Sequence, residues 1–456
     1  MNRYLFVDLG STFTKLTLID IDNLQVVATS SSFTTAKTDV TIGFLNALEL
    51  LEKNLGQKAN YKKAFACSSA SGGLKMAAIG LVSELTTEAA KRVCLGSGAK
   101  VDLVFSGILT NSEVEEIKNS DTDIILLAGG IDGGDKKTVI ENSKILKQNN
   151  INIPIIYAGN KEAVDQVKEI LKTYNSELYI SLNVMPKLNK LHITSTKNLI
   201  RQIFIEKIIY AKGIDRLNKY LDGPIIPTPV SLLNVCSLIT TRTEPVIIVD
   251  IGGATTDIYS VGYGYPKRPD TALIGLEEPF LKRTVEGDLG MRYSVNGLLD
   301  NLSNLEVNSL KEKFDLTKEI KKRKTNINYL PKTNNDYLVE SEIASACADI
   351  AFSRHVGTIK EAYTHNGPVY YQTGKDLTNA KYIIGTGGVI VNNPNNNEIL
   401  TSLLTKTTKP NELRPLKPKI LIDEFYLLSA IGLLSTIDTN KALQLFNKKI
   451  LKRGEL

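Results

Sequence analysis

The stretch YLFVDLGSTFTKLTLID (residues 4–20) decides how the rest of the sequence is interpreted. Its apolar run breaks at Asp8 and Gly10, passes through hydroxyl-bearing residues to Lys15, and resumes with the alternation of a strand. An ordinary two-residue hairpin needs only Asn-Gly or Asp-Gly at its turn. Taken alone, the stretch still fits such a hairpin. The additional hydroxyl and basic groups indicate a turn with a chemical role.

A second copy of this unit supports that interpretation. The segment VDLGSTFTKLTLID (7–20) aligns without a gap with VDIGGATTDIYSVG (249–262), and Val, Asp, Gly and a later Thr are identical. Each copy stands at the head of a new α/β segment, as a duplicated domain predicts. A third glycine turn lies in IIGTGG (383–388), after another apolar strand.

Glycine turns of this kind are suited to binding a polyphosphate. Backbone N–H groups and hydroxyls in a tight turn donate to an anion, and glycine permits the close approach. A carboxylate reaches phosphate only through a divalent cation such as Mg²⁺. We therefore expect Asp8 and Asp250 to face each other as metal ligands and catalytic residues, with Lys15 neutralising a terminal phosphoryl group. The expected contacts to ATP are Gly10, Ser11, Thr12 and Thr14 in the first turn, Gly252, Gly253, Ala254, Thr255 and Thr256 in the second, and Gly385, Thr386, Gly387 and Gly388 in the third.

Composition excludes several other classes of protein. The chain has 456 residues, enough for two to four domains, and its 55 basic and 49 acidic residues are mixed along the sequence. There is no Trp and no interleaving of aromatic and basic residues, so nucleic acid is a poor first hypothesis. The four Cys are isolated and the three His lack metal-ligand spacing, which argues against a zinc site. We expect neither a signal peptide nor a membrane span. We expect a cytoplasmic location.

The order of predicted elements gives the domain organisation. Strands and helices alternate strictly over about 100–185, which predicts a Rossmann-like parallel sheet with crossover helices. SASGGLKMAAIGL (69–81) is expected to be a glycine-rich loop that opens a helix, and residues 337–363 a long helix. The domains predicted are 1–242, which includes the Rossmann-like segment, and 243–422. They are followed by a C-terminal helix at 423–440 and a tail at 441–456, in which NKKILKRGEL (447–456) is expected to be loose.

The three turns, in this order, resemble those of the actin, sugar kinase and heat-shock chaperone superfamily. The resemblance implies an α/β fold of two ribonuclease-H-like domains around a nucleotide cleft, the first enlarged by the Rossmann-like segment. DLGSTFTK would be the first phosphate motif, DIGGATTD the second and IIGTGG the adenosine motif. PTPVSLLNVCSL would be the helix that crosses between the domains, and DEFYLLSAIGLLS the helix that returns to the first.

Longer blocks narrow the resemblance. ACSSASGGLKMAAIGLVSELTTEAAKRVCLGSGAKV, IILLAGGIDGGDKKTVIENSKIL, NVMPKLNKLHI and KRTVEGDLGMR are similar to the glutamate mutase accessory proteins, called MutL or GlmL. The likeness extends from residue 1 to about 440. It implies a slow Mg²⁺-dependent ATPase that acts as a reactivating chaperone of an adenosylcobalamin-dependent mutase and exchanges damaged cobalamin for intact cofactor. The chain has no D-x-H-x-x-G cobalamin-ligand pattern, so the partner is expected to handle cobalamin.

Other functions of the same fold stay open at this point. A small-molecule kinase needs a general-base Asp near the substrate hydroxyl, and no acid lies in a recognisable sugar-kinase context. A nucleotide-sensing scaffold that does not hydrolyse ATP would use the same turns. An iron–sulfur activator of dehydratases needs clustered thiols, and the scattered Cys argue against it.

Three further segments have two interpretations each. LLAGGIDGGDKKT (126–138) has the glycine gap of a P-loop, but Asp135 stands where Lys should follow, so a strand-to-helix turn is favoured. RTVEGDLGMR, which contains Arg283, Glu286, Asp288 and Arg292, would either open a helix beside the ribose or form an interdomain salt-bridge cluster. The Ser pair 68–69 would either position the attacking water or cap a helix.

Overall fold

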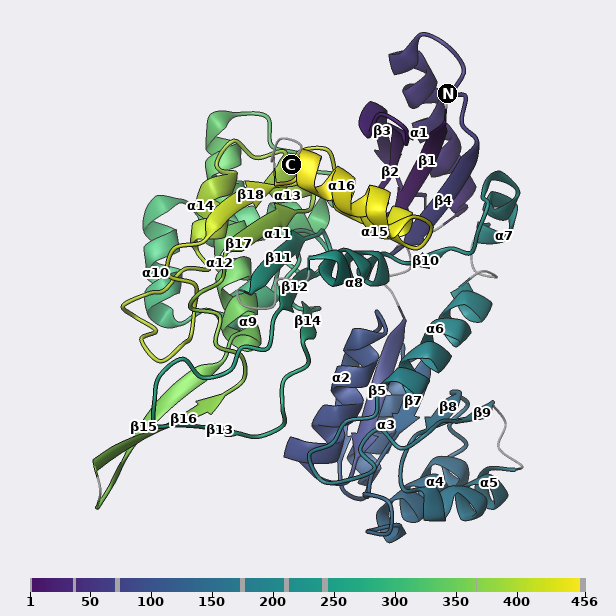
Figure 1. Ribbon diagram of the computed structural model, residues 1–456, viewed down its shortest axis with the longest axis vertical. Helices are drawn as coiled ribbons and strands as arrows, with labels where there is room; N and C mark the ends of the chain where they lie inside the picture. Colours follow the sequence, from purple (N-terminus) through teal and green to yellow (C-terminus); the bar gives the residue numbers. More distant parts are fainter. Residues whose placement is uncertain are drawn as a thin grey trace. The chain divides into compact units, whose positions relative to one another are not determined.

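The structure is a computed structural model that describes residues 2–35, 38–69, 74–172, 177–208, 213–239, 245–365 and 367–451 (Figure 1). It divides into two compact units. Unit 1 contains Met1–Ser71, Ile209–Ile274 and Glu278–Leu456, and unit 2 contains Gly72–Ile208 with Gly275–Glu277. The predicted domain boundary at 242 lies outside the described residues, so that boundary stays a prediction.

The first sheet of unit 1 contains the N-terminal hairpin. Its strands run in the order β10-β4-β1-β2-β3. Strands β1, β2 and β3 are antiparallel neighbours, while β4 is parallel to β1 and β10 is parallel to β4. Helix α1 packs on β2 and β3. The bounds are β1 Arg3–Leu9, β2 Phe13–Asp20, β3 Gln25–Phe33, α1 Val40–Leu55, β4 Lys63–Ser68 and β10 Ile226–Pro227.

The second sheet of unit 1 repeats this plan. Its order is β14-β12-β11-β17-β18, with β11, β12 and β14 antiparallel and β17 and β18 parallel to β11. In both sheets, three antiparallel strands come first along the chain. Two further strands then lie on the other side of the first strand and run parallel to it. This is the ribonuclease-H-like order. The duplication and the fold class predicted from the sequence are therefore confirmed. The bounds are β11 Val246–Ile251, β12 Thr256–Val261, β14 Leu281–Glu286, β17 Tyr382–Thr386 and β18 Lys419–Ile422.

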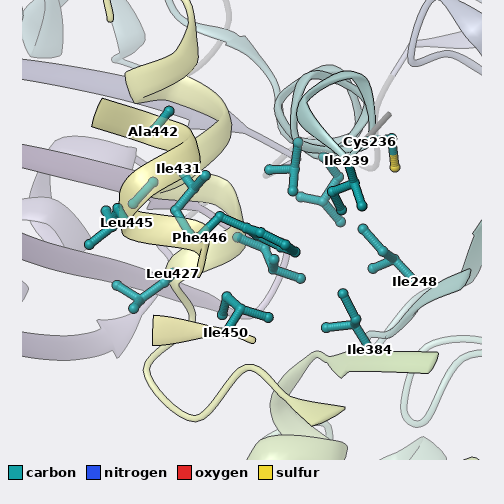
Figure 2. Close-up of a cluster of buried hydrophobic side chains, with 14 of the residues drawn as sticks. Cys236, Ile239, Ile248, Ile384, Leu427, Ile431, Ala442, Leu445, Phe446 and Ile450 are labelled. Carbon is teal, nitrogen blue, oxygen red and sulfur yellow. The ribbon is translucent and has the colours of Figure 1, made fainter. Parts of the chain in front are cut away.

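Three helices share a hydrophobic core with both sheets. These are α8 (Thr228–Leu238), α15 (Leu427–Ser435) and α16 (Thr439–Lys449). Figure 2 shows Phe446 of α16 beside Ile248 and Ile384 of the second sheet. Helices α8 and α15 cross so closely that a Cβ on Gly432 would lie 2.0 Å from the carbonyl oxygen of Ser231. The resemblance assigned the crossing and returning roles to these two helices, and residues of both lie in the core that the two sheets share.

The C-terminal part differs from what the sequence predicted. The predicted tail at 441–456 instead contains helix α16, which continues to Lys449 into the segment expected to be loose, and Leu445, Phe446 and Ile450 are buried. Residues 452–456 lie outside the described residues. Ala442, Leu445 and Phe446 recur at the spacing of one helical face, and Asp438 caps the helix by accepting from the Lys441 N–H.

We call the part of unit 1 that contains the second sheet the second half. Its other elements are mostly helices. The expected helix at 337–363 instead begins at Asn334, with Thr333 in a capping box, and ends at His355, because the chain then turns at Gly357 into strand β15. Figure 1 shows β15 and β16 as a projecting hairpin, to which β13 adds a third strand. The bounds are β13 Thr271–Ile274, α9 Gly297–Asn301, α10 Asn304–Lys313, α11 Leu316–Thr325, α12 Asn334–His355, β15 Thr358–Thr364, β16 Gly367–Thr373, α13 Gly388–Val391 and α14 Asn396–Thr401.

Unit 2 is the predicted parallel sheet with crossover helices. Its strand order is β6-β5-β7-β8-β9, and every pairing is parallel. Residues 75–80 form strand β5 and not the expected helix, because Met76 to Gly80 are buried on both faces and so show no alternation. The bounds are β5 Lys75–Gly80, η1 Ser83–Thr87, α2 Glu88–Gly96, β6 Lys100–Ser106, α3 Asn111–Asn119, β7 Ile124–Leu127, α4 Lys137–Gln148, β8 Ile155–Tyr157, α5 Val164–Leu171, β9 Leu178–Ile180 and α6 Thr194–Ile208.

Two predictions from composition can be checked against these elements. The four Cys are free and buried, as expected for reduced thiols. Across the parts of the chain that the structure describes, no helix combines the length and apolar character needed to cross a bilayer.

Candidate functional site

The turns of the two repeated hairpins have the same backbone geometry. The Gly10 N–H donates to the Phe13 carbonyl over 3.0 Å, and the Gly252 N–H donates to the Thr255 carbonyl over 2.9 Å. A Cβ on Gly10 would lie 2.6 Å from that Phe13 oxygen, so only glycine fits without a shift. The equivalence of the two turns follows from the sequence repeat.

These two turns meet inside unit 1. A Cβ on Gly253 would lie 2.8 Å from Oγ1 of Thr12. That hydroxyl is buried and has no hydrogen-bond partner among the described residues. Because an unpaired buried hydroxyl is unfavourable and uncommon, its position between two glycine turns points to a polar ligand at this place.

The first carboxylate is held by its neighbours. Asp8 lies opposite Lys15 in the β1–β2 register. Its Oδ1 accepts from Oγ1 of Thr228 over 3.0 Å and from Sγ of Cys67 over 3.5 Å. Burial, and then the charge of Asp8, raise the pKa of the Cys67 thiol well above its ordinary value, so the thiol keeps its proton and donates.

The second carboxylate lies against the third turn. Asp250 is paired with Thr386 across β11 and β17. Gly387 has φ +93°, and a Cβ there would lie 2.8 Å from Oδ1 of Asp250. Although Asp250 keeps some solvent exposure, burial raises its pKa to about 7, with further contributions from Asp257, Asp8 and Asp423, while Lys15 acts in the opposite sense. Acidic and basic groups from all three turns therefore act on Asp250.

A second buried carboxylate, which sequence reasoning missed, closes the third turn. Asp423 accepts from Oγ1 of Thr386 over 3.0 Å, and from the N–H groups of Leu427 and Leu428 over 2.6 and 3.1 Å. Burial raises its pKa to about 6. An Asp just before an apolar helix is a capping signal, and that pattern was visible in the sequence.

A segment at 289–294 supports the second turn. The Met291 N–H donates to the Gly252 carbonyl, and the N–H groups of Arg292 and Tyr293 both donate to the Gly253 carbonyl, over 2.8 to 3.0 Å. Oγ of Ser294 donates to the Ala254 carbonyl over 2.5 Å. The carbonyl groups of this turn are thus bound on the protein side. No sequence pattern indicated this support.

The acidic and basic residues of RTVEGDLGMR form ion pairs within the second half. Arg283 binds Asp257 over 2.7 Å. Glu286 and Asp288 both bind Arg354, over 2.5 and 2.9 Å. Arg292 binds Glu340 over 2.8 Å. Residues 283 and 286 lie on strand β14, so the segment does not open a helix there. The observed ion pairs favour the salt-bridge interpretation. These pairs lie within one half and do not connect two domains.

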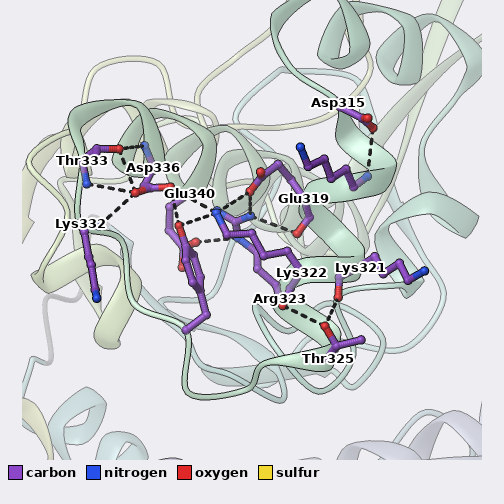
Figure 3. Close-up of polar contacts among 12 residues, drawn as sticks. Asp315, Glu319, Lys321, Lys322, Arg323, Thr325, Lys332, Thr333, Asp336 and Glu340 are labelled. Carbon is purple, nitrogen blue, oxygen red and sulfur yellow. Dashed lines mark hydrogen bonds and ion pairs between the residues drawn. The ribbon is translucent and has the colours of Figure 1, made fainter.

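Glu340 extends this network to a second buried arginine. Its Oε2 accepts from Nε of Arg323 over 2.8 Å, and Arg323 also binds Glu319 over 2.6 Å (Figure 3). Arg323 is fully buried, and Glu340 is almost so. The network therefore joins α11 and α12 to the segment that supports the second turn.

The remaining predicted site residues divide into two groups. The hydroxyls of Thr14 and Thr256 are bound internally, to Oγ1 of Thr34 over 2.9 Å and to the Leu289 carbonyl over 2.5 Å. Gly385 faces the core, since a Cβ there would lie 2.7 Å from a methyl carbon of Leu400. The partly exposed residues of the turns are Gly10, Ser11, Thr12, Gly252, Gly253, Ala254 and Thr255.

Two segments outside the turns have their polar groups bound internally. In the loop 129–135 of unit 2, Asp132 accepts from the Lys161 N–H over 3.0 Å and Asp135 from the Thr138 N–H over 3.2 Å, which supports a strand-to-helix turn over a P-loop. The ring nitrogens of His355 lie 2.8 Å from Oγ of Ser260 and 2.9 Å from Oγ1 of Thr284, consistent with a structural role.

The donor set restricts the kind of metal site. Among the described residues, no group of three or more His, Cys, Asp or Glu side chains is arranged to hold a metal ion. Asp8 and Asp250 offer carboxylate oxygens only, which suit Mg²⁺ when nucleotide phosphates and water complete its shell. The residues present therefore fit a metal that arrives with a nucleotide.

Two ribonuclease-H-like halves, joined by crossing helices and meeting at glycine turns, define the actin-like ATPase fold class. Comparison with known proteins identifies the family within this class. The family model described as "MutL protein" matches residues 4–450. Protein MutL from Clostridium tetanomorphum is 45% identical over 461 residues, covering 99% of this chain and 100% of that protein. The chain belongs to the MutL family.

Solved structures with a similar fold are more distant. Nucleotide-free acetone carboxylase is 11% identical with a TM-score of 0.40, covering 95% of this chain and 70% of that one. Gluconate kinase from Lactobacillus acidophilus is 12% identical with a TM-score of 0.35, covering 98% and 92%. The activator of 2-hydroxyisocaproyl-CoA dehydratase from Clostridium difficile, with bound ADPNP, is 11% identical with a TM-score of 0.32, covering 100% and 99%. At these scores the likenesses do not bear on function.

Proposed function

We propose that this chain binds ATP with Mg²⁺ between its two hairpin turns, and acts as a reactivating accessory protein of an adenosylcobalamin-dependent mutase of the glutamate mutase type. The observation that carries the nucleotide part is the contact of Gly253 with the unpartnered hydroxyl of Thr12. It brings together two turns of equal geometry, each preceded by a carboxylate.

Each group has a role that its position supports. Asp8 and Asp250 bind Mg²⁺ through its waters and the nucleotide phosphates, and Lys15 binds the terminal phosphoryl group. The hydroxyl of Thr12 and the backbone N–H groups of the two turns donate to phosphate oxygens. The Gly387 turn lies at the adenosine side.

The mutase part of the proposal rests on membership of the MutL family. A helper that releases a damaged cofactor needs two states with different affinity for its partner, and nucleotide binding and hydrolysis supply such a difference. If the two states are coupled to the partner in this way, ATP hydrolysis is slow in the protein alone and faster in the presence of the mutase.

The nucleotide part is tested by titrating the protein with ATP, with and without Mg²⁺, in a calorimeter. Wild type is expected to bind ATP only with Mg²⁺, while Asp8→Asn and Asp250→Asn lose that binding. Asp300→Asn, which changes an exposed carboxylate on α9, is the matched control and is expected to bind like wild type. Wild-type protein that binds no Mg·ATP, or Asp variants that bind it normally, would contradict the proposal.

The partner part is tested by measuring ATP hydrolysis with and without purified glutamate mutase holding inactivated cobalamin. Stimulation of hydrolysis, together with ATP-dependent release of the cobalamin, is expected. Stimulation by a polyol and not by the mutase would instead indicate a small-molecule kinase. Normal Mg·ATP binding with no hydrolysis in either condition would indicate a nucleotide-sensing scaffold.

A further inference from the structure

Lys15 lies among carboxylates without pairing to any of them. It stands opposite Asp8 in the hairpin, and its charge acts on Asp250 and Asp423. Within the part of the chain that the structure describes, its ammonium group makes neither an ion pair nor a hydrogen bond. Its Nζ lies instead 3.9 Å from the ring centroid of Tyr426. A lysine so placed must be kept from its acidic neighbours by something else.

Tyr426 is fixed in an unusual backbone conformation. With φ +53° it is one of five non-glycine residues with positive φ among those described, and the only aromatic one. Its N–H donates to the Asp423 carbonyl over 3.0 Å, and its Oη accepts from Nδ2 of Asn392 over 2.6 Å. For a bulky side chain this conformation is strained, and such strain persists where the surroundings impose it, often at functional sites.

The same side chain reaches the third turn. A Cβ on Gly388 would lie 4.0 Å from Oη of Tyr426. The ring thus spans from the Lys15 ammonium, on the first hairpin, to the turn assigned to adenosine. It comes from the loop between β18 and α15, which the sequence analysis did not connect with the site.

We propose that Tyr426 is a positioning residue that keeps Lys15 unpaired and directed to the terminal phosphoryl group of the bound nucleotide. This inference rests on the proposed function. An aromatic face attracts an ammonium group without neutralising its charge. If Lys15 formed an ion pair with Asp8 or Asp250, its charge would be neutralised, and phosphate would have to displace the carboxylate in order to bind. The strained backbone holds the ring in place.

The inference predicts a change in the discrimination between ATP and ADP. Tyr426→Leu removes the ring, and its affinity for Mg·ATP is expected to fall about tenfold while that for Mg·ADP changes little. Tyr426→Phe retains the ring and is expected to keep the wild-type ratio of the affinities for Mg·ATP and Mg·ADP. If the hydroxyl had only a structural role and the ring had none, Tyr426→Phe would not restore this ratio. The matched control is Tyr363→Leu, which changes an exposed tyrosine on β15 and is expected to leave both affinities as they are.

A spectroscopic test does not require nucleotide. The chain has no Trp, so Tyr426→Trp places a single tryptophan at this position, and its emission can be excited selectively over that of the tyrosines. Its emission is expected to differ between the Lys15 protein and the Lys15→Met protein, and to change when Mg·ATP draws the ammonium away. Emission that is insensitive both to Lys15→Met and to Mg·ATP would overturn the inference, even if Tyr426→Leu fails to fold.

The outcomes separate the inference from the proposal beneath it. Wild-type protein that binds no Mg·ATP contradicts the proposed function, and the role of Tyr426 with it. Wild-type binding combined with an unchanged ATP-to-ADP ratio in Tyr426→Leu contradicts the inference alone.

Discussion

Gly253 and Thr12 belong to different repeats, yet a Cβ on Gly253 would lie 2.8 Å from Oγ1 of Thr12. Gly253 is the counterpart of Ser11 in the repeat, so the second turn has no side chain at the point where the first turn approaches it. The two turns therefore differ in a complementary way. One supplies a hydroxyl, and the other the space for it.

The hydroxyl of Thr12 is predicted to act on binding and not on folding. Thr12→Val keeps the shape of the side chain and removes a buried hydroxyl that has no partner. The nucleotide-free variant is expected to be as stable as wild type or more stable by about 1 kcal/mol, because no hydrogen bond is lost. Its affinity for Mg·ATP is expected to fall about tenfold, since a bond to a charged phosphate oxygen is lost. Thermal unfolding and calorimetric titration measure the two effects.

Thr87 provides the matched control for this change. Its Oγ1 is also buried, and the described part of the chain offers it no hydrogen-bond partner, but it lies in unit 2 at the end of η1. Thr87→Val is expected to have the same small effect on stability and to leave ATP affinity unchanged. Equal affinities of wild type and Thr12→Val would remove Thr12 from the site.

The raised pKa of Asp250 predicts a pH dependence of nucleotide binding. Since its pKa is about 7, the carboxyl is largely protonated at pH 6. Mg²⁺ requires the ionised form, so affinity for Mg·ATP is expected to rise with pH up to about 7, by up to about tenfold for each pH unit, and to level off above it. Stability of the free protein has the opposite sign: because the folded-state pKa is raised, this contribution is present at low pH and lost as pH rises through about 7.

Carbon-13 NMR of labelled Asp carboxyl groups measures this titration directly. One signal is expected to titrate near pH 7 in the nucleotide-free protein and to disappear in Asp250→Asn, while Asp300→Asn leaves it in place. Asp423, whose pKa is raised to about 6, should give a separate signal. Affinity for Mg·ATP that is constant between pH 6 and 8 would count against Asp250 as a metal ligand.

The parts of the site that follow local rules could be predicted from the sequence. Gly10 and Gly252 stand in hairpins whose geometry depends on a few neighbouring residues, so the repeat was sufficient to locate both turns. The fold class followed from the same turns, whereas the family followed from the longer blocks of sequence. Asp423 and Tyr426, by contrast, reach the first hairpin only after the chain has folded back on itself, and no local pattern reports such a contact.

Two errors in the secondary structure have different causes. Strand β5 is apolar on both faces, so periodicity alone could not separate it from a buried helix. Helix α16 did carry a helical signal in Ala442, Leu445 and Phe446, together with an N-cap at Asp438. There the terminal position of the segment was given more weight than the spacing of its apolar residues.

The last prediction concerns Glu340, which joins two buried arginines. Its carboxylate binds Arg292 and Arg323, each over 2.8 Å, and Glu340 is 3% exposed. Figure 3 shows the pair with Arg323. Glu340→Gln keeps the shape but leaves positive charge buried with less compensation, and is expected to destabilise the second half by about 3 kcal/mol. Because the Arg292 N–H donates to the Gly253 carbonyl, amide hydrogen exchange in residues 252–256 is expected to become faster.

Glu342, two residues further along α12, gives the matched control. Its carboxylate binds Lys313 over 2.6 Å, but the lysine side chain is 51% exposed. A surface pair of this kind contributes at most about 1 kcal/mol, so Glu342→Gln should leave both the denaturation midpoint and the exchange of the second turn nearly unchanged. If Glu340→Gln and Glu342→Gln had equal effects on urea unfolding, the buried network would contribute no more to stability than an exposed ion pair. If only the midpoint changed and exchange at 252–256 did not, the network would stabilise the helices without supporting the turn.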